Sequence, residues 1–388
     1  MTSILGILLA LVLLMALAYR GVSVLILAPL MALLAALFSP DAPLLASYTQ
    51  VFMPALGGFV IAFFPLFLLG AVFGKLMEDS GAATVIAQAI VKTLGVQRAI
   101  LAIVLACAVL TYGGVSLFVV AFAVYPIAAA LFRRADVPQR LIPGTIALGA
   151  FTFTMTALPG TPAIQNAIPM PFFGTTPFAA PGLGLIGGAV MLVLGTLWLV
   201  RRAATATARG EGYGEHDEAV APSNPASAAP TAARPAPAAA SGADFNGRAF
   251  ARAIAPVVLV IALNYLLATW LLPALDTAYL AEPRFGATAI GNVRGIWAVI
   301  AALAAAIVLL VVLQRPHLPQ LSHTLGQGAS GSVLPLLNTA SQVGFGAVIA
   351  SLAGFAIIRD AVLAIAPGNP LVSVSIAVNI LAGITGSA

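Results

Sequence analysis

The feature that most restricts the fold of this chain is a succession of apolar segments, most of them roughly 16 to 24 residues long. A helix of that length matches the hydrocarbon core of a bilayer, about 30 Å thick, whereas strands of a membrane barrel are about ten residues long and alternate in polarity. The composition agrees, because 61% of the residues are hydrophobic and only 7% are charged. We therefore expect an all-α, polytopic transmembrane helical bundle. The expected helices lie at residues 4–18, 22–37, 57–76, 141–155, 183–200, 253–272 and 296–313, with a shorter one at 82–94.

The charged residues point to membrane topology and not to nucleic acid. The formal net charge is +5, but the basic residues lie at the ends of apolar segments and do not form a patch. The single cysteine, Cys107, excludes a disulfide within a monomer, and His216, His317 and His323 lack metal-ligand spacing. No Walker A, H-E-x-x-H or G-x-S-x-G motif occurs. We expect neither an enzyme nor a bound metal or cofactor.

The apolar run from Ala99 to Phe132 contains the stretch T-Y-G-G-V-S at residues 111–116. The run is too long for one membrane span and too short for two spans with a turn. A re-entrant hairpin that turns at T-Y-G-G-V-S puts every basic residue before residue 203 on one side, which the positive-inside rule makes cytoplasmic. These residues are Arg20, Lys75, Lys92, Arg98, Arg133, Arg134, Arg140, Arg201 and Arg202. Close helix packing through the glycines is the alternative explanation.

Residues 203–248 differ in character from the rest of the chain. They are rich in Ala, Pro and Ser, cannot bury a core, and are expected to form a disordered cytoplasmic linker. This linker would tether two halves, with regulatory docking as the alternative role. We expect residues 1–202 to form a first transmembrane repeat and residues 249–388 a second one that begins on the opposite side of the membrane.

The two halves share a register that suggests inverted-topology repeats, a signature of transporters. It aligns three pairs of glycines: Gly81 with Gly354, Gly95 with Gly368, and Gly113 with Gly386. The same register aligns T-Y-G-G-V-S with I-T-G-S-A, at which the sequence ends. We therefore expect the second repeat to be truncated at its hairpin, lacking roughly 60 to 80 residues by analogy with the first.

Polar breaks in apolar segments provide the candidate binding residues. A second break, residues 152–169, combines helix-breaking Pro and Gly with hydroxyl and amide side chains, and a third lies at residues 336–342. Broken helices at membrane depth direct dipole ends toward an anionic substrate. The substrate-binding candidates are Thr111, Tyr112, Gly113, Gly114, Ser116, Thr156, Pro159, Gly160, Thr161, Gln165, Asn166, Asn338, Thr339, Thr385, Gly386 and Ser387. The alternatives are an ordinary extracellular loop at 152–169 and interhelical hydrogen bonding at 336–342.

Acidic residues are scarce outside loops and the linker. Glu78 and Asp79 are the candidates for proton coupling, since intramembrane carboxylates commonly serve as proton relays. The alternative is a solvated helix end in which both acids pair with Lys75, three and four residues earlier. The site hydroxyls could instead bind a cation.

Four stretches resemble the gluconate permease (GntP) family: GKLMEDSGAA (74–83), LTYGGVSLFVVAFAVYPIA (110–128), FTMTALPGTPAIQNAIP (153–169) and ILAGITGSA (380–388). The resemblance implies a secondary transporter with inverted repeats, two hairpins and two broken helices. It also implies proton-coupled uptake of gluconate or a related small hydroxy-carboxylate across the bacterial inner membrane. A sodium-coupled organic anion carrier and a non-transporting scaffold or sensor are the alternatives, and the oligomeric state stays open.

Overall fold

The computed structural model describes residues 2–214, 247–365 and 368–385, and every regular element in these ranges is helical. The described residues divide into two compact units. One unit is built from residues 2–64 and 333–385, and the other from residues 65–214 and 247–332. The expected all-α bundle is confirmed.

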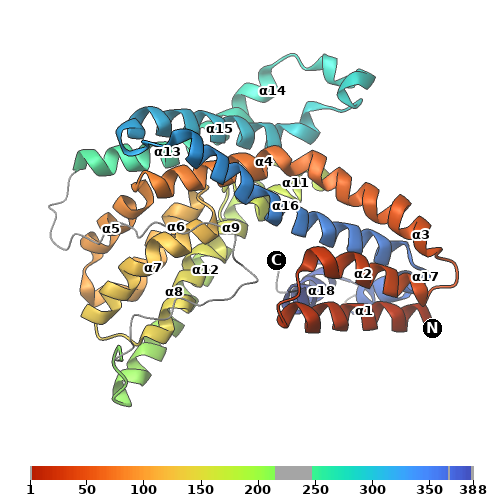
Figure 1. Cartoon of the computed structure of the whole chain (residues 1–388), viewed down its shortest axis with the longest axis horizontal. Helices are drawn as coiled ribbons and strands as arrows, with labels where there is room; N and C mark the ends of the chain where they lie inside the picture. Colours follow the sequence, from red (N-terminus) through yellow and green to blue (C-terminus); the bar gives the residue numbers. More distant parts are fainter. Residues whose placement is uncertain (1, 215–246, 366–367, 386–388) are drawn as a thin grey trace. The chain divides into compact units, whose positions relative to one another are not determined.

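The first unit is a group of helices from both ends of the chain. Its elements are α1 (Thr2–Tyr19), α2 (Val24–Leu37), α3 (Leu44–Ala46), a π-helical stretch (Ser47–Phe52), the first part of α4 (Met53–Asp79), the second part of α16 (Leu321–Ser351), α17 (Ala353–Leu363) and α18 (Pro370–Thr385). In Figure 1, α1 and α2 lie side by side, and α17 also packs against α1. Small residues allow these close contacts, since a Cβ added at Gly354 would lie 2.8 Å from the backbone nitrogen of Ile4.

The second unit holds the hairpin and the broken segment. Its elements are the end of α4, α5 (Ala82–Leu94), α6 (Ala99–Tyr112), α7 (Leu117–Arg134), α8 (Ile142–Ala150), α9 (Phe153–Thr156), α10 (Ile164–Ala167), α11 (Met170–Phe173), α12 (Pro181–Ala208), α13 (Gly247–Leu266), a π-helical stretch (Leu267–Leu271), α14 (Leu272–Ala274), α15 (Ile290–Gln314) and the start of α16. Short 3-10 turns occupy Val96–Arg98, Gln139–Leu141, Ala278–Ala281, Pro283–Phe285 and Arg315–His317. Helix α13 packs along α15 (Figure 1).

Helix α6 lies at the centre of this unit, in contact with α5, α7 and α8. Its side chains are largely buried, including the thiol of Cys107. The approach of α8 depends on Gly149, because a Cβ there would overlap the carbonyl oxygen of Val104. The chain bends by 106° between α5 and α6 at Gly95, whose φ of +76° suits glycine. The predicted turn at T-Y-G-G-V-S is confirmed, and the membrane path of the hairpin stays a prediction.

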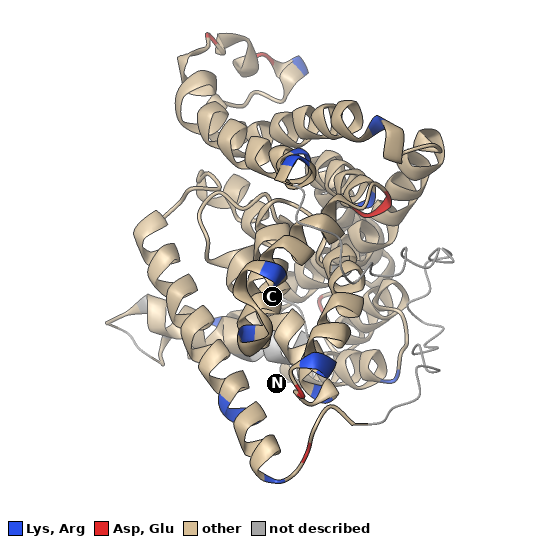
Figure 2. Cartoon of the chain, turned by 90° about the vertical axis from the view of Figure 1, so that its left-hand side faces the viewer, with Lys and Arg blue, Asp and Glu red and all other residues tan. Residues whose placement is uncertain are grey.

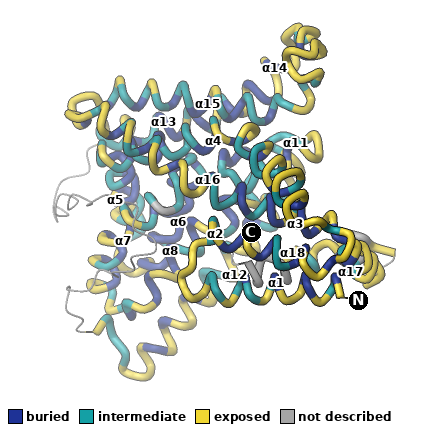
Figure 3. Tube along the Cα trace, turned by 45° about the vertical axis from the view of Figure 1, so that its right-hand side comes forward, coloured by how far each residue is buried: buried dark blue, intermediate teal, exposed yellow. Residues whose placement is uncertain are grey.

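Six helices in the described residues are long and apolar enough to cross a membrane: residues 2–19, 44–79, 181–208, 247–274, 290–317 and 321–351. A seventh span results if the bent pair α5–α6 counts as one. Helix α12 leaves large apolar side chains such as Leu183, Ile186 and Trp198 exposed. Figure 3 shows exposed positions along the outer helices and buried positions where helices meet. Such apolar outer surfaces suit contact with lipid.

The segments that follow α7 and α12, both cytoplasmic in the predicted topology, lie next to each other in the structure. Arg140, after α7, forms an ion pair with Glu211, which follows α12. The backbone N–H of Tyr213 also donates a 2.9 Å hydrogen bond to Asp136. Arg140 holds the pKa of the Glu211 carboxyl below its usual range, through a hydrogen bond and charge attraction. These contacts agree with the prediction that the basic residues after α7 and at the end of α12 lie on the same side of the membrane. Elsewhere the charged residues are few and dispersed (Figure 2).

Candidate functional site

The tip of the α6–α7 hairpin contacts the broken segment at residues 157–163. Tyr112, the last residue of α6, donates a hydrogen bond of 2.6 Å from its hydroxyl to the backbone carbonyl of Pro159. Tyr112 is only partly buried. Two motifs that the sequence analysis treated separately thus form one joint, which we call the hairpin joint: residues 111–116 and 157–163.

Glycine is needed at the tip for two different reasons. A Cβ at Gly113 would overlap the side chain of Val257 on α13. Gly114 has a φ of +90°, and a Cβ there would lie 2.9 Å from Cγ of Pro162. The glycines therefore provide both the turn and the close packing that were proposed as alternatives.

The helix break in the second motif is confirmed. Helix α9 ends at Thr156 and α10 begins at Ile164, so the chain between them is unwound. Its backbone groups find partners nearby, because the N–H of Gly160 donates to the carbonyl of Pro177 at 2.7 Å. The side-chain nitrogen of Asn166 donates to the carbonyls of Thr161 and Pro177, at 3.0 and 3.1 Å. Unwound backbone at membrane depth requires partners of this kind.

Asn264 on α13 is a residue that the sequence analysis missed. Its side-chain nitrogen donates a 3.1 Å hydrogen bond to the carbonyl of Gly160, and the residue is fully buried. The ring of Phe178 covers Gly160 and contacts Tyr265 edge to face, with ring centroids 5.2 Å apart. The signal was present in the sequence, since an amide within an apolar span is costly unless it has a role.

The other substrate-binding candidates of this unit differ in how far they are buried. Thr111 is buried, and its hydroxyl oxygen has no hydrogen-bond partner among the described residues. Thr161 is also buried and accepts a hydrogen bond of 3.3 Å from the N–H of Ala163. Gln165 is partly buried. Thr156 is exposed, and its hydroxyl donates to the carbonyl of Thr152 at 3.3 Å.

The remaining substrate-binding candidates come from the second half of the chain, after residue 333. Asn338 and Thr339 lie on α16, where Thr339 donates a 2.9 Å hydrogen bond to the carbonyl of Pro335. The side-chain oxygen of Asn338 is buried without a partner among the described residues. Thr385 is the last residue of α18, and Gly386 and Ser387 lie outside the described residues. Their role in the site stays a prediction.

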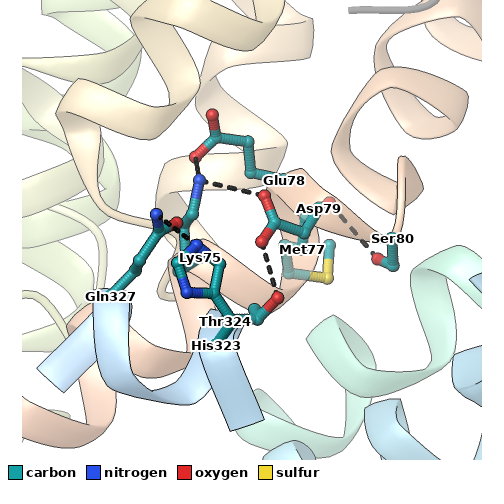
Figure 4. Close-up of polar contacts among 8 residues, drawn as sticks. All are labelled: Lys75, Met77, Glu78, Asp79, Ser80, His323, Thr324 and Gln327. Carbon is teal, nitrogen blue, oxygen red and sulfur yellow. Dashed lines mark hydrogen bonds and ion pairs between the residues drawn. The ribbon is translucent and has the colours of Figure 1, made fainter. Parts of the chain in front are cut away.

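The proton-coupling candidates form a cluster between α4 and α16 (Figure 4). Lys75 lies 3.4 Å from Glu78 and 2.9 Å from Asp79, as the spacing along the helix suggested. The second oxygen of Asp79 accepts a 2.7 Å hydrogen bond from the hydroxyl of Thr324 on α16. The acids are about one-third exposed, so this is neither a fully solvated helix end nor a buried pair.

His323 neighbours this cluster on α16, where its ring nitrogen pairs with Gln327 at 2.9 Å. The two helices approach closely because Gly328 faces Val72, with a hypothetical Cβ only 2.8 Å from the Cα of Val72. Thr324 was missed in the sequence analysis, because nothing in a local pattern relates it to Asp79.

Helix α4 connects the carboxylate cluster to the hairpin joint. A Cβ at Gly74 would lie 3.2 Å from the backbone nitrogen of Ser116, the residue that precedes α7. Lys75 follows Gly74 directly, and the two acids lie one turn further along the same helix. The candidate proton site and the contact with the hairpin tip are therefore neighbours along α4.

Comparison with known proteins adds to this geometry. The family described as "GntP family permease" matches residues 1–176. A relative from Bacillus subtilis (strain 168), named "Uncharacterized transporter YxjC", is 45% identical over 387 residues, which cover 98% of this chain and 80% of the relative. No solved structure matches. The apolar helices, the hairpin, the broken segment and these matches lead to one conclusion: the chain belongs to the GntP permease family and is a multi-pass membrane transporter.

Proposed function

We propose that this transporter carries gluconate or a related small hydroxy-carboxylate across the bacterial inner membrane, together with protons. The hydrogen bond between Tyr112 and Pro159 is the observation that carries the proposal, because it brings two helix breaks together. Helix ends at such breaks offer backbone N–H groups to a carboxylate, and hydroxyl and amide side chains suit the hydroxyls of the substrate. The side chain of Ser116 does not cap α7, which leaves the first-turn amides of that helix available to a carboxylate.

In this proposal the joint holds the substrate. The binding residues are the predicted set in this unit: Thr111, Tyr112, Gly113, Gly114, Ser116, Pro159, Gly160, Thr161, Gln165 and Asn166, with Thr156 at its exposed edge. The candidates in the second half are proposed to bind substrate as well: Asn338, Thr339, Thr385, Gly386 and Ser387. Residues 1–202 and 249–388 would act as inverted repeats, joined by residues 203–248.

Asp79 is the favoured proton acceptor, because its side chain joins α4 to α16 through Thr324, whereas the side chain of Glu78 pairs with Lys75 on its own helix. Protonation of Asp79 would remove its charge attraction to Lys75 and weaken its acceptance of the Thr324 hydroxyl. The packing of α4 against α16 would then depend on the proton. His323 is the other titratable group near the cluster on α16.

The test is uptake of labelled gluconate, glycerate, lactate and citrate into proteoliposomes that contain the full chain. We expect at least one hydroxy acid to accumulate under an inwardly directed proton gradient without sodium. Accumulation that needs a sodium gradient would favour the sodium-coupled carrier, and binding without counterflow would favour a sensor. If none of the four accumulates under either gradient, the proposal is wrong.

Asp79→Asn and Glu78→Gln form a matched pair for proton coupling. We expect Asp79→Asn to abolish accumulation driven by the proton gradient while it retains exchange of internal for external substrate. Glu78→Gln should retain most accumulation. Equal effects of the two substitutions would contradict the assignment of the proton to Asp79.

A further inference from the structure

We propose that Asn264 is a specificity-determining residue, whose side-chain oxygen accepts a hydrogen bond from a hydroxyl group of the substrate. The inference rests on the proposed function, since it concerns the same joint. It adds a residue from α13 that belongs to neither of the motifs that carry the site.

The orientation of the Asn264 amide follows from its partner. The carbonyl of Gly160 can only accept, so the group within 3.1 Å of it is the side-chain nitrogen. The side-chain oxygen therefore points elsewhere. It is buried and has no hydrogen-bond donor among the described residues.

An unpartnered buried oxygen is costly, and few remain so in folded proteins without a reason. Packing of the broken segment requires only the nitrogen of Asn264, which satisfies the carbonyl of Gly160. The oxygen contributes nothing to that contact. A role in folding alone thus explains why the side-chain nitrogen of Asn264 is buried, but it does not explain the buried side-chain oxygen.

A second buried oxygen of the same joint also lacks a partner. The hydroxyl of Thr111 is buried and has no hydrogen-bond partner among the described residues, and its neighbour Tyr112 bonds to Pro159. Asn264 bonds to Gly160, the residue after Pro159. The joint and its contact from α13 thus include two neutral oxygens without partners in the described part of the chain.

The surroundings favour a hydroxyl group over a cation as the missing partner. No acidic residue occurs in α6, α7, α13, α15 or residues 152–180. Helix α4 approaches the tip at Gly74, and the acids of its next turn, Glu78 and Asp79, already pair with Lys75. A neutral amide oxygen without carboxylate support suits a hydroxyl donor, and hydroxyls are what distinguish a hydroxy-carboxylate from a simple carboxylate.

The test compares substrates that differ by a single hydroxyl, such as lactate and propionate, or gluconate and its deoxy analogues. The ratio of kcat/KM for the two compounds is measured in the same vesicles, so the amount of folded transporter does not affect it. We expect Asn264→Leu to lower this ratio at least tenfold, because the leucine fills a similar volume without an acceptor. Asn264→Ala, which also lacks an acceptor, provides a second variant if the leucine chain does not fold.

Thr154→Val is the matched control, since Thr154 is outside the proposed binding set and its buried hydroxyl also donates to a backbone carbonyl, that of Gly149, just before the broken segment. It should lower transport of both compounds and leave their ratio within about twofold of wild type. An unchanged ratio in the Asn264 variants would show that Asn264 acts only as a structural clamp and overturn the inference. If wild type carries no hydroxy acid at all, the proposed function fails and the inference fails with it.

Discussion

The hydroxyl of Tyr112 and the carbonyl oxygen of Pro159 are joined by a 2.6 Å hydrogen bond that connects the end of α6 to an unwound segment 47 residues later. The bond holds the hairpin tip against a chain segment that has lost its own helical hydrogen bonds. Removal of the hydroxyl would leave a backbone carbonyl without a donor.

Tyr112→Phe should loosen the hairpin joint while it retains the ring. The loss of a hydrogen bond to a partly buried carbonyl costs about 1–3 kcal/mol. We expect an approximately tenfold or greater fall in kcat/KM for substrate uptake and a lower melting temperature in detergent. Tyr125→Phe is the control, because Tyr125 is an exposed residue of the same hairpin. Equal behaviour of the two variants would contradict a special role for the contact.

Gly114→Ala should destabilise the tip for two reasons, the φ of +90° and the proximity of Pro162. Strain of this kind costs about 1–3 kcal/mol. Gly187→Ala on α12 should not destabilise, since a Cβ there meets nothing within 4 Å and alanine favours the helix. Thermal unfolding of the purified chain in detergent checks both expectations. A Gly114→Ala variant as stable as wild type would show that the tip can adopt another turn.

Thr324→Val should weaken the contact between α4 and α16. The hydroxyl of Thr324 donates a 2.7 Å hydrogen bond to the Asp79 carboxylate, and a hydrogen bond to a charged group contributes about 1.5–3 kcal/mol. We therefore expect a lower melting temperature of the purified chain in detergent. Thr205→Val on α12 is the control, because the Thr205 hydroxyl donates to the carbonyl of Arg201 on its own helix. Equal melting temperatures of the two variants would argue against a special role for the Thr324 contact.

Glu211→Gln should release the segment after α12 from the loop after α7. Because Arg140 lowers the pKa of Glu211 from its ordinary 4.5, the folded chain binds a proton there less readily than the unfolded chain. The contact therefore contributes fully above pH 4.5 and is lost as the pH falls through the lowered pKa. Hydrogen exchange at residues 209–214 should be faster in the variant at neutral pH. The exchange rates of wild type and variant should become equal at acidic pH. A difference in rate that persists there would point to another cause.

Much of the architecture could be read from local sequence. Helix α5 begins and ends at the expected residues 82 and 94, and α2 differs from its expected range by two residues at its start. Helix α4 differs more, because it continues a helical stretch that begins at Leu44, where polar residues such as Gln50 obscured the pattern. Hydropathy and helix breakers act over a few residues, and so a local pattern predicts them.

The sequence by itself determined the helical bundle, the turn at T-Y-G-G-V-S, the break at residues 157–163 and the pairing of Lys75 with Glu78 and Asp79. Only the tertiary structure decided which of these elements meet. The contacts of Tyr112 with Pro159, Asn264 with Gly160 and Thr324 with Asp79 join residues 47, 104 and 245 positions apart. Such pairs leave no local signal, because they arise when packing brings buried polar groups together and each must find a partner.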